Sequence, residues 1–104
     1  MKKNIFQNIP LDIPEEIFET IIESSSVKVE KIISRGQKSP DNFWYDQDKN
    51  EWVIIIKGEA RLQFENNQTI DLVEGDYLNI PAHQKHRVLW TKPDEETIWL
   101  AVYY

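Results

Sequence analysis

Hydrophobic and polar residues recur along this chain with two different periods, and the first of them is helical. Within residues 12–23, DIPEEIFETIIE, apolar side chains recur every three or four positions while glutamates occupy the opposite side. Asp12 and Glu15 have the spacing of a capping box, and Pro14 stands in the first turn, where its missing N–H is tolerated. The pattern predicts one short helix that ends at the serines of residues 24–26.

After residue 26 the period changes to that of β-strands. Apolar residues alternate with polar ones around turns such as Asn66-Asn67, since Asn tolerates a positive φ. The strand candidates are residues 27–33, 52–57, 60–64, 70–72, 77–80, 87–91 and 97–103. Short strands that arrive in hairpins predict an all-β antiparallel barrel or sandwich over residues 27–104. Residues 1–26 are then an N-terminal arm that contains the short helix.

Composition narrows the class of protein. The 104 residues suit a single domain, and the net charge of −6 without a basic cluster argues against a nucleic-acid partner. No apolar run approaches the roughly 20 residues of a membrane span, and the N-terminus lacks the apolar stretch of a signal peptide. Disulfides and thiol chemistry are excluded because there is no cysteine. The expectation is a cytoplasmic protein with no membrane partner.

Two residues that can carry chemistry are predicted to point into one interior from distant strands. Glu51 begins an apolar strand and shares a face with Val53, because side chains alternate along a strand. By the same rule His86 shares a face with Val88 and Trp90. A carboxylate buried in such an interior needs a hydrogen bond, a proton or a metal ion.

These residues also stand in the register of a known family. Glu51, followed after six residues by Gly58, resembles the end of the first cupin motif. Gly75, Pro81 and His86 resemble the second cupin motif, and the resemblance covers residues 27–104. It implies a small single-domain cupin, a double-stranded β-helix or jelly-roll barrel. Because one fold hosts many unrelated chemistries, the family alone does not assign a function.

The resemblance also implies a metal ion. Cupins typically hold a divalent ion through two histidines and a glutamate of the first motif and a histidine of the second. Glu51 and His86 match this pattern, but neither histidine of the first motif is present. Their two positions are occupied, depending on the register, by Trp44 and Asp46 or by Tyr45 and Gln47. Since a carboxylate or amide oxygen can replace a ligand, the predicted metal residues are Glu51, His86 and either Asp46 or Gln47, for Zn, Mn, Fe or Ni.

Several of these residues have a structural interpretation as well. Glu51 and His86 either hold the ion or hydrogen-bond across an empty barrel mouth. Trp44 and Trp90 either fill the core or form the walls of a ligand pocket. His83 replaces a glycine that is usual in the second motif, and it either contacts the ligand or lies at the rim.

Three functions stay open at this point. The first is a metal-dependent enzyme, isomerase-like or lyase-like, that acts on a small polar molecule such as a sugar or sugar phosphate; no catalytic residue is assigned. Arg61 and Arg87 are the candidates for pairing with a phosphate. The second is a non-catalytic barrel that binds a small ligand. The third is a structural dimer with a degenerate metal site: the resemblance implies a homodimer, and the strand WVIIIK is apolar on both faces.

Overall fold

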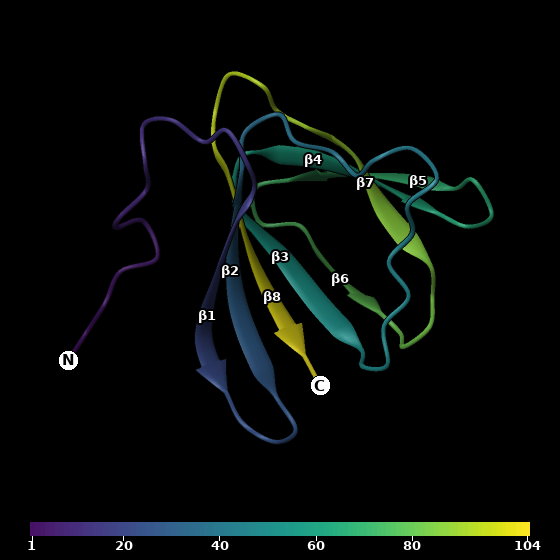
Figure 1. Ribbon diagram of the computed structural model, residues 1–104, viewed down its shortest axis with the longest axis horizontal. Helices are drawn as coiled ribbons and strands as arrows, with labels where there is room; N and C mark the ends of the chain where they lie inside the picture. The colour runs from purple at the N-terminus through teal and green to yellow at the C-terminus, as the bar shows by residue number, and fades with distance from the viewer.

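The computed structural model describes residues 1–104 as two antiparallel β-sheets that face each other (Figure 1). Its eight strands are β1 (Ile17–Glu23), β2 (Lys28–Ser34), β3 (Glu51–Lys57), β4 (Glu59–Phe64), β5 (Thr69–Val73), β6 (Tyr77–Ile80), β7 (His86–Thr91) and β8 (Thr97–Tyr103). One sheet has the order β1-β2-β8-β3-β6, and the other has the order β5-β4-β7. The predicted all-β antiparallel fold is confirmed, since every pair of neighbouring strands is antiparallel.

The hydrophobic core lies between the two sheets. Ten buried residues form it: Ile32, Val53, Ile55, Ala60, Leu62, Phe64, Leu72, Ile80, Trp99 and Ala101. Most of them stand at alternate positions of their strands, as the period of two predicts. Glu51 belongs to the same inward-facing set as Val53 and Ile55, and only 8 % of its surface is exposed.

The predicted helix at residues 12–23 is wrong. Residues Ile17–Glu23 form the edge strand β1, which pairs with β2 in the register Ile17↔Ile33 to Glu23↔Lys28. Ser24 does not end a helix but begins the turn between β1 and β2. Its backbone N–H donates to the carbonyl of Val27 at 2.8 Å, which closes a β-hairpin. The isoleucines and Thr20 of this segment suit a strand equally well, and pairing along the sheet edge overrides the local helical pattern. No helix in the structure has the length and apolar character needed to span a membrane.

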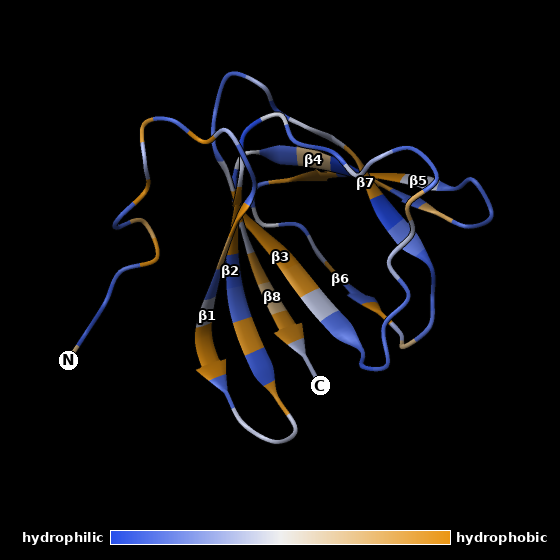
Figure 2. Cartoon of the chain, in the orientation of Figure 1, coloured by the Kyte–Doolittle hydropathy of each residue, from blue (hydrophilic) through white to orange (hydrophobic).

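Apolar residues make up much of β3 and β8 (Figure 2), and some of them lie on the outer face of the five-stranded sheet. Ile54 pairs with Leu100 and Trp52 pairs with Val102, so these four side chains form two adjacent rungs on the side away from the core. The ring of Trp52 lies 5.5 Å from the ring of Tyr77, which extends the patch onto β6. Both faces of β3 are therefore apolar.

Candidate functional site

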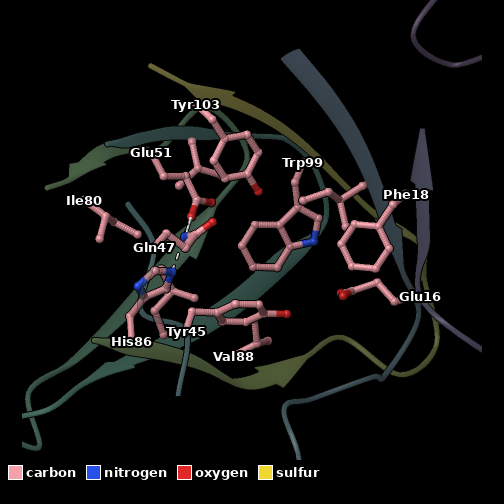
Figure 3. Close-up of a pocket in the computed structure, with 13 residues that line it drawn as sticks. Glu16, Phe18, Tyr45, Gln47, Glu51, Ile80, His86, Val88, Trp99 and Tyr103 are labelled. Atoms are coloured by element: carbon pink, nitrogen blue, oxygen red, sulfur yellow. Dashed lines mark hydrogen bonds and ion pairs between the residues drawn. The ribbon is translucent and has the colours of Figure 1, made fainter. Parts of the chain in front are cut away.

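A cleft opens between the two sheets at the ends of β3, β7 and β8 (Figure 3). It encloses about 480 Å³, counting the part open to solvent. Its walls are mostly apolar or aromatic, and its polar groups gather at two ends. The lining side chains are Glu16, Phe18, Ile32, Tyr45, Gln47, Glu51, Val53, Leu62, Ile80, His86, Val88, Trp99 and Tyr103. An apolar cleft with a few convergent polar groups is typical of a small-molecule site.

Glu51 and His86 meet at one end of this cleft. The Nε2 atom of His86 lies 3.3 Å from Oε1 of Glu51, and both side chains are almost completely buried. The same carboxylate oxygen accepts a hydrogen bond of 2.9 Å from the side-chain amide of Gln47. The prediction that β3 and β7 present a carboxylate and an imidazole to one interior is borne out by this contact. The metal ion predicted between them is a separate matter that the contact does not test.

The orientation of the His86 ring follows from its second nitrogen. Nδ1 lies 3.0 Å from the carbonyl oxygen of Gln84, which can only accept, so Nδ1 carries a hydrogen. Nε2 is then the atom that exchanges a proton with Glu51 or offers a lone pair. Burial alone lowers the pKa of His86, but the contacts with Glu51 and the Gln84 carbonyl outweigh it and raise the pKa above its ordinary value.

The segment before β3 shows which of the two alternative residue pairs of the first motif faces inward. Tyr45 forms an isolated β-bridge with His86, and its ring stacks on the imidazole at 5.4 Å between ring centroids. Gln47, two residues after Tyr45, also points into the cleft, where it contacts Glu51. The inward pair is thus Tyr45 and Gln47, and Trp44 points away, with the Arg87 guanidinium 5.9 Å from its ring centre.

Asp46 lies outside the cleft, although it is one of the two alternative metal residues. Its carboxylate contacts Nδ1 of His83 at 2.8 Å, and Nε2 of His83 lies 3.7 Å from Asp48. The His83 side chain is 63 % exposed and its backbone has a φ of 65°, so it belongs to the loop and not to the barrel interior. The backbone N–H of His83 donates to the carbonyl of Gln47, so this loop supports the segment that carries Gln47.

Trp90 also lies outside the cleft. The expectation that it shares the inward face of His86 and Val88 is therefore wrong. Val88 pairs with Leu62 and Trp90 pairs with Arg61, so β7 has one residue, Leu89, more than β4 at this point. The resulting bulge turns the following side chain to the opposite face. None of the three predicted pocket residues, Trp44, His83 and Trp90, lines the cleft.

The other end of the cleft is held by residues that sequence reasoning did not select. The buried hydroxyl of Ser34 accepts a hydrogen bond from Nε1 of Trp99 at 3.1 Å and donates one of 2.5 Å to Glu16. At the first end, where β8 pairs Tyr103 with Glu51 of β3, the hydroxyl of Tyr103 donates to Glu30 at 3.4 Å. Burial, reinforced by the charges of Glu51 and Glu30, raises the pKa of Tyr103 far above its ordinary value, so the phenol stays neutral.

A signal for two of these residues was present in the sequence. Trp99, Ala101 and Tyr103 alternate along the last strand and share one face. Glu16 and Phe18 were obscured because their segment has the helical period described above. Only the pairing of β1 with β2 brings them to the cleft.

The side chains of this site offer few ligands for a metal ion. Nowhere in the structure do three or more His, Asp or Glu side chains converge. The cleft offers Nε2 of His86, the Glu51 carboxylate and the Gln47 amide, whose oxygen faces the cleft if the amide rotates. The Gln84 carbonyl fixes the ring orientation of His86 through Nδ1, as the hydrogen-bond partners of metal-bound histidines do. One imidazole, one carboxylate and one amide fit a weakly held divalent ion.

Comparison with known proteins agrees with this architecture. A family model described as "Cupin domain" matches residues 32–103. No curated protein matches the chain. A solved structure from Ralstonia eutropha JMP134, described as a "putative mannose-6-phosphate isomerase", is 42 % identical with a TM-score of 0.95, over 99 % of this chain and 96 % of that chain. A cupin superfamily protein from Desulfitobacterium hafniense DCB-2 is 22 % identical with a TM-score of 0.76, over 91 % of this chain and 82 % of that one.

Proposed function

The chain belongs to the cupin superfamily, and from that premise we propose that it is an isomerase-like enzyme for a small polar molecule without a phosphate group, such as a sugar. The observation that carries the proposal is the buried contact of Glu51 with His86 in a cleft with apolar walls. The description of the Ralstonia protein as a mannose-6-phosphate isomerase supports sugar chemistry of this type.

The Glu51–His86 pair has the parts that a proton shift beside a carbonyl needs. In an aldose–ketose isomerisation one base removes a proton from the carbon next to the carbonyl and returns it to the neighbouring carbon. Glu51 is suited to be that base, and protonated Nε2 of His86 is suited to donate a hydrogen bond to the carbonyl oxygen. Tyr45 stacks on the imidazole and Gln47 bonds the carboxylate, so both groups are held in place for the transfer.

The charges around the cleft disfavour a phosphate. Two of its lining residues, Glu16 and Glu51, are carboxylic acids, and no lysine or arginine lines it. Arg61 pairs with Asp71 on an exposed surface, and Arg87 donates to the backbone carbonyls of Ser39 and Pro40. A phosphate ester would thus enter a negative cleft in which the one cation, His86, is already paired with Glu51. The substrate is accordingly a molecule without a phosphate.

Proton exchange in D₂O tests this function. We expect the protein to incorporate deuterium at the carbon beside the carbonyl of unphosphorylated mannose, glucose or fructose and to interconvert these sugars. Mannose 6-phosphate should react at least about tenfold more slowly than mannose, because its charge is repelled. Proton NMR measures both rates. Sugar binding without exchange would leave the non-catalytic alternative, and faster reaction of the phosphate ester would contradict the charge argument.

We propose a divalent ion as the alternative to proton transfer by this pair: Glu51, the deprotonated Nε2 of His86 and the Gln47 oxygen would hold it. When bound, the ion would act as a Lewis acid on a carbonyl or hydroxyl of the substrate. Because only one imidazole is available, we expect Zn, Mn, Fe or Ni to bind weakly and to be lost on chelation. Titration of metal-depleted protein, followed by tryptophan fluorescence and elemental analysis, measures this. Binding that persists unchanged in His86→Ala would contradict the assignment, and Asp46→Asn is the matched control outside the cleft.

We also propose that the protein is a homodimer and that the apolar outer face of the five-stranded sheet is its interface. Trp52, Ile54, Leu100 and Val102 form a continuous patch there, and such patches mark association surfaces. Light scattering should give a dimer for the wild type and a monomer for Ile54→Glu. Val73→Glu is the control, because Val73 is 49 % exposed on β5 of the other sheet and should leave the dimer intact. A monomeric wild type would refute the interface.

A further inference from the structure

We infer that the cleft selects a ligand with a positively charged ammonium group, which would sit against Glu16 while a hydroxyl or carbonyl of the same molecule reaches Glu51 and His86. The inference names the substrate class of the site proposed above and rests on that function. It concerns residues 16 and 18, which lie outside the part of the chain that the cupin family model matches.

Glu16 is the carboxylate of the cleft that lacks a cationic partner. Glu51 contacts His86 and Gln47, and Glu30 is paired with Lys28 at 3.3 Å. Glu16 forms no ion pair, and its one side-chain partner is the hydroxyl of Ser34. Burial, together with the charge of Glu30, raises the pKa of Glu16 above its ordinary value in spite of that hydrogen bond. A carboxylate in this position gains from a cation supplied by the ligand.

The Glu16 carboxylate is also held in a fixed place. Ser34 is completely buried, and its hydroxyl is oriented because it accepts from the Trp99 indole and donates to Glu16. In Figure 3 the carboxylate of Glu16 lies beside Phe18 and faces the side of the cleft where the Tyr45 hydroxyl points. The acidic group is thus preorganised toward the cleft and not toward solvent.

Aromatic rings line the cleft between the Glu16 carboxylate and the Glu51–His86 pair (Figure 3). Phe18, Tyr45, Trp99 and Tyr103 all line the cleft, so a bound ammonium would contact ring faces as well as a carboxylate. Aromatic faces attract cations, and cages of rings are a recurrent way to recognise substituted ammonium groups. Hydrophobic walls also accept the alkyl substituents of such a group, which a phosphate or a carboxylate ligand does not offer.

The electrostatic environment of the cleft agrees with a cation. Two carboxylates, Glu16 and Glu51, line the cleft, and a third, Glu30, lies beside it as the acceptor of the Tyr103 hydroxyl. The lining contains no lysine or arginine to offset these groups. The chemistry that fits both ends is a small amine or quaternary ammonium with a hydroxyl or carbonyl, as in an amino sugar or an amino alcohol.

Binding of a charged and a neutral isostere tests the inference. Choline and 3,3-dimethylbutan-1-ol have nearly the same shape and differ by the positive charge. We expect isothermal titration of the wild type to show choline binding at least about tenfold more tightly than the neutral alcohol. In Glu16→Gln, which keeps an oxygen for the Ser34 hydroxyl, the ratio should fall close to one. Glu15→Gln, at an exposed neighbouring position, should keep the wild-type ratio.

The outcomes separate this inference from the function on which it rests. Equal binding of the two isosteres, no binding of choline, or a preference that survives in Glu16→Gln would overturn the choice of a cation. If sugars still exchange deuterium in that case, the isomerase proposal stands. Choline selection that depends on Glu16, combined with no exchange in any sugar or amino sugar, would instead support the inference and refute the isomerase chemistry.

Discussion

Replacing Glu51 with glutamine is expected to lower the rate of deuterium exchange at the substrate by at least about 100-fold, the range in which general bases contribute. The amide has the size of the carboxylate and can still accept hydrogen bonds, but it cannot remove a proton. The same change removes the negative charge beside Nε2 of His86, 3.3 Å away, so the imidazole also loses the group that favours its protonated form. Exchange rates from proton NMR, at saturating sugar, measure the loss.

The control for this variant is Glu23→Gln, at an exposed position at the end of β1 that forms no ion pair. It changes the net charge by the same amount and should leave the exchange rate within about twofold, because screening removes the influence of distant surface charges. Thermal unfolding of both variants shows whether the fold is intact. A folded Glu51→Gln protein with wild-type exchange would remove Glu51 from the role of the base.

Replacing Gly58 with alanine is expected to destabilise the protein by about 3–5 kcal/mol, the sum of a strained backbone and an overpacked contact. Gly58 joins β3 to β4 with a φ of 93°, a conformation that side chains rarely adopt. An added Cβ would lie 2.4 Å from Oγ1 and 2.6 Å from Cα of Thr97. Since the Cα atom is backbone, the clash cannot be relieved by a rotamer change. A loss of this size approaches the total stability of a small domain.

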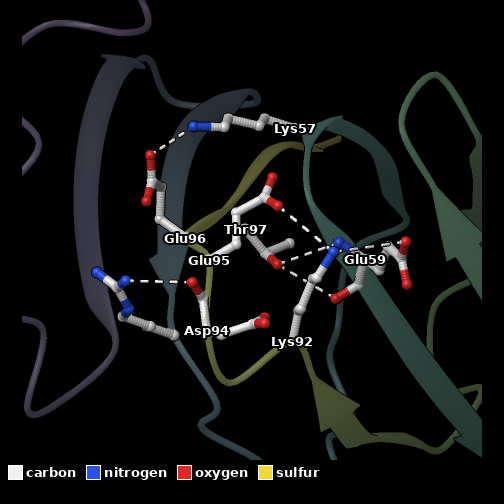
Figure 4. A network of polar contacts seen from close by, with 8 residues as sticks. Lys57, Glu59, Lys92, Asp94, Glu95, Glu96 and Thr97 are labelled. Carbon is white, nitrogen blue, oxygen red and sulfur yellow. Dashed lines mark hydrogen bonds and ion pairs between the residues drawn. The ribbon is translucent and has the colours of Figure 1, made fainter.

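Thr97 itself has little freedom to move. It is completely buried, and its hydroxyl donates to the Glu59 carbonyl at 3.1 Å and accepts from the Glu59 N–H at 3.2 Å (Figure 4). These bonds hold the start of β8 against the start of β4, beside the half-buried ion pair of Lys57 with Glu96. Any shift of Thr97 to accommodate a methyl group breaks both bonds.

Gly75→Ala is the matched control for Gly58→Ala. Gly75 has a similar φ of 90°, but an added Cβ would meet no atom within 4 Å. Gly75→Ala should therefore lower the free energy of unfolding only by the backbone strain of the alanine, about 1–2 kcal/mol. Urea unfolding gives the free energy of unfolding for both variants. If Gly58→Ala and Gly75→Ala lose the same free energy of unfolding, the contact with Thr97 is not what requires a glycine at position 58.

The strands and the central pair of the site were predictable from the sequence because both depend on a period of two. The strand 52–57 was expected from its run of β-branched residues, and β3 (Glu51–Lys57) extends it by one residue. Glu51 was expected to face inward with Val53, and its burial agrees. In addition, the spacing of Gly58, Gly75 and His86 carried the family, because these residues mark turns and a strand whose places are set by the fold.

The failures have particular physical causes. Residues 12–23 have a helical period, yet Ile17–Glu23 pairs with β2, since a strand at a sheet edge gains backbone hydrogen bonds that a local pattern does not reveal. Trp90 was expected inside, but a single extra residue at the bulge of β7 reverses the faces beyond it. Neither event leaves a clear mark in the residues concerned.

The sequence by itself determined the fold class, the pairing of Glu51 with His86 and the absence of the two usual histidines, because alternation and spacing are local properties of the chain. The tertiary structure decided that Tyr45 and Gln47, not Trp44 and Asp46, face the cleft, since the β-bridge to His86 sets that register. It also decided that Glu16 and Phe18 complete the cleft. Those residues reach it only through the edge strand β1, and the contacts that place an edge strand join segments far apart in the chain.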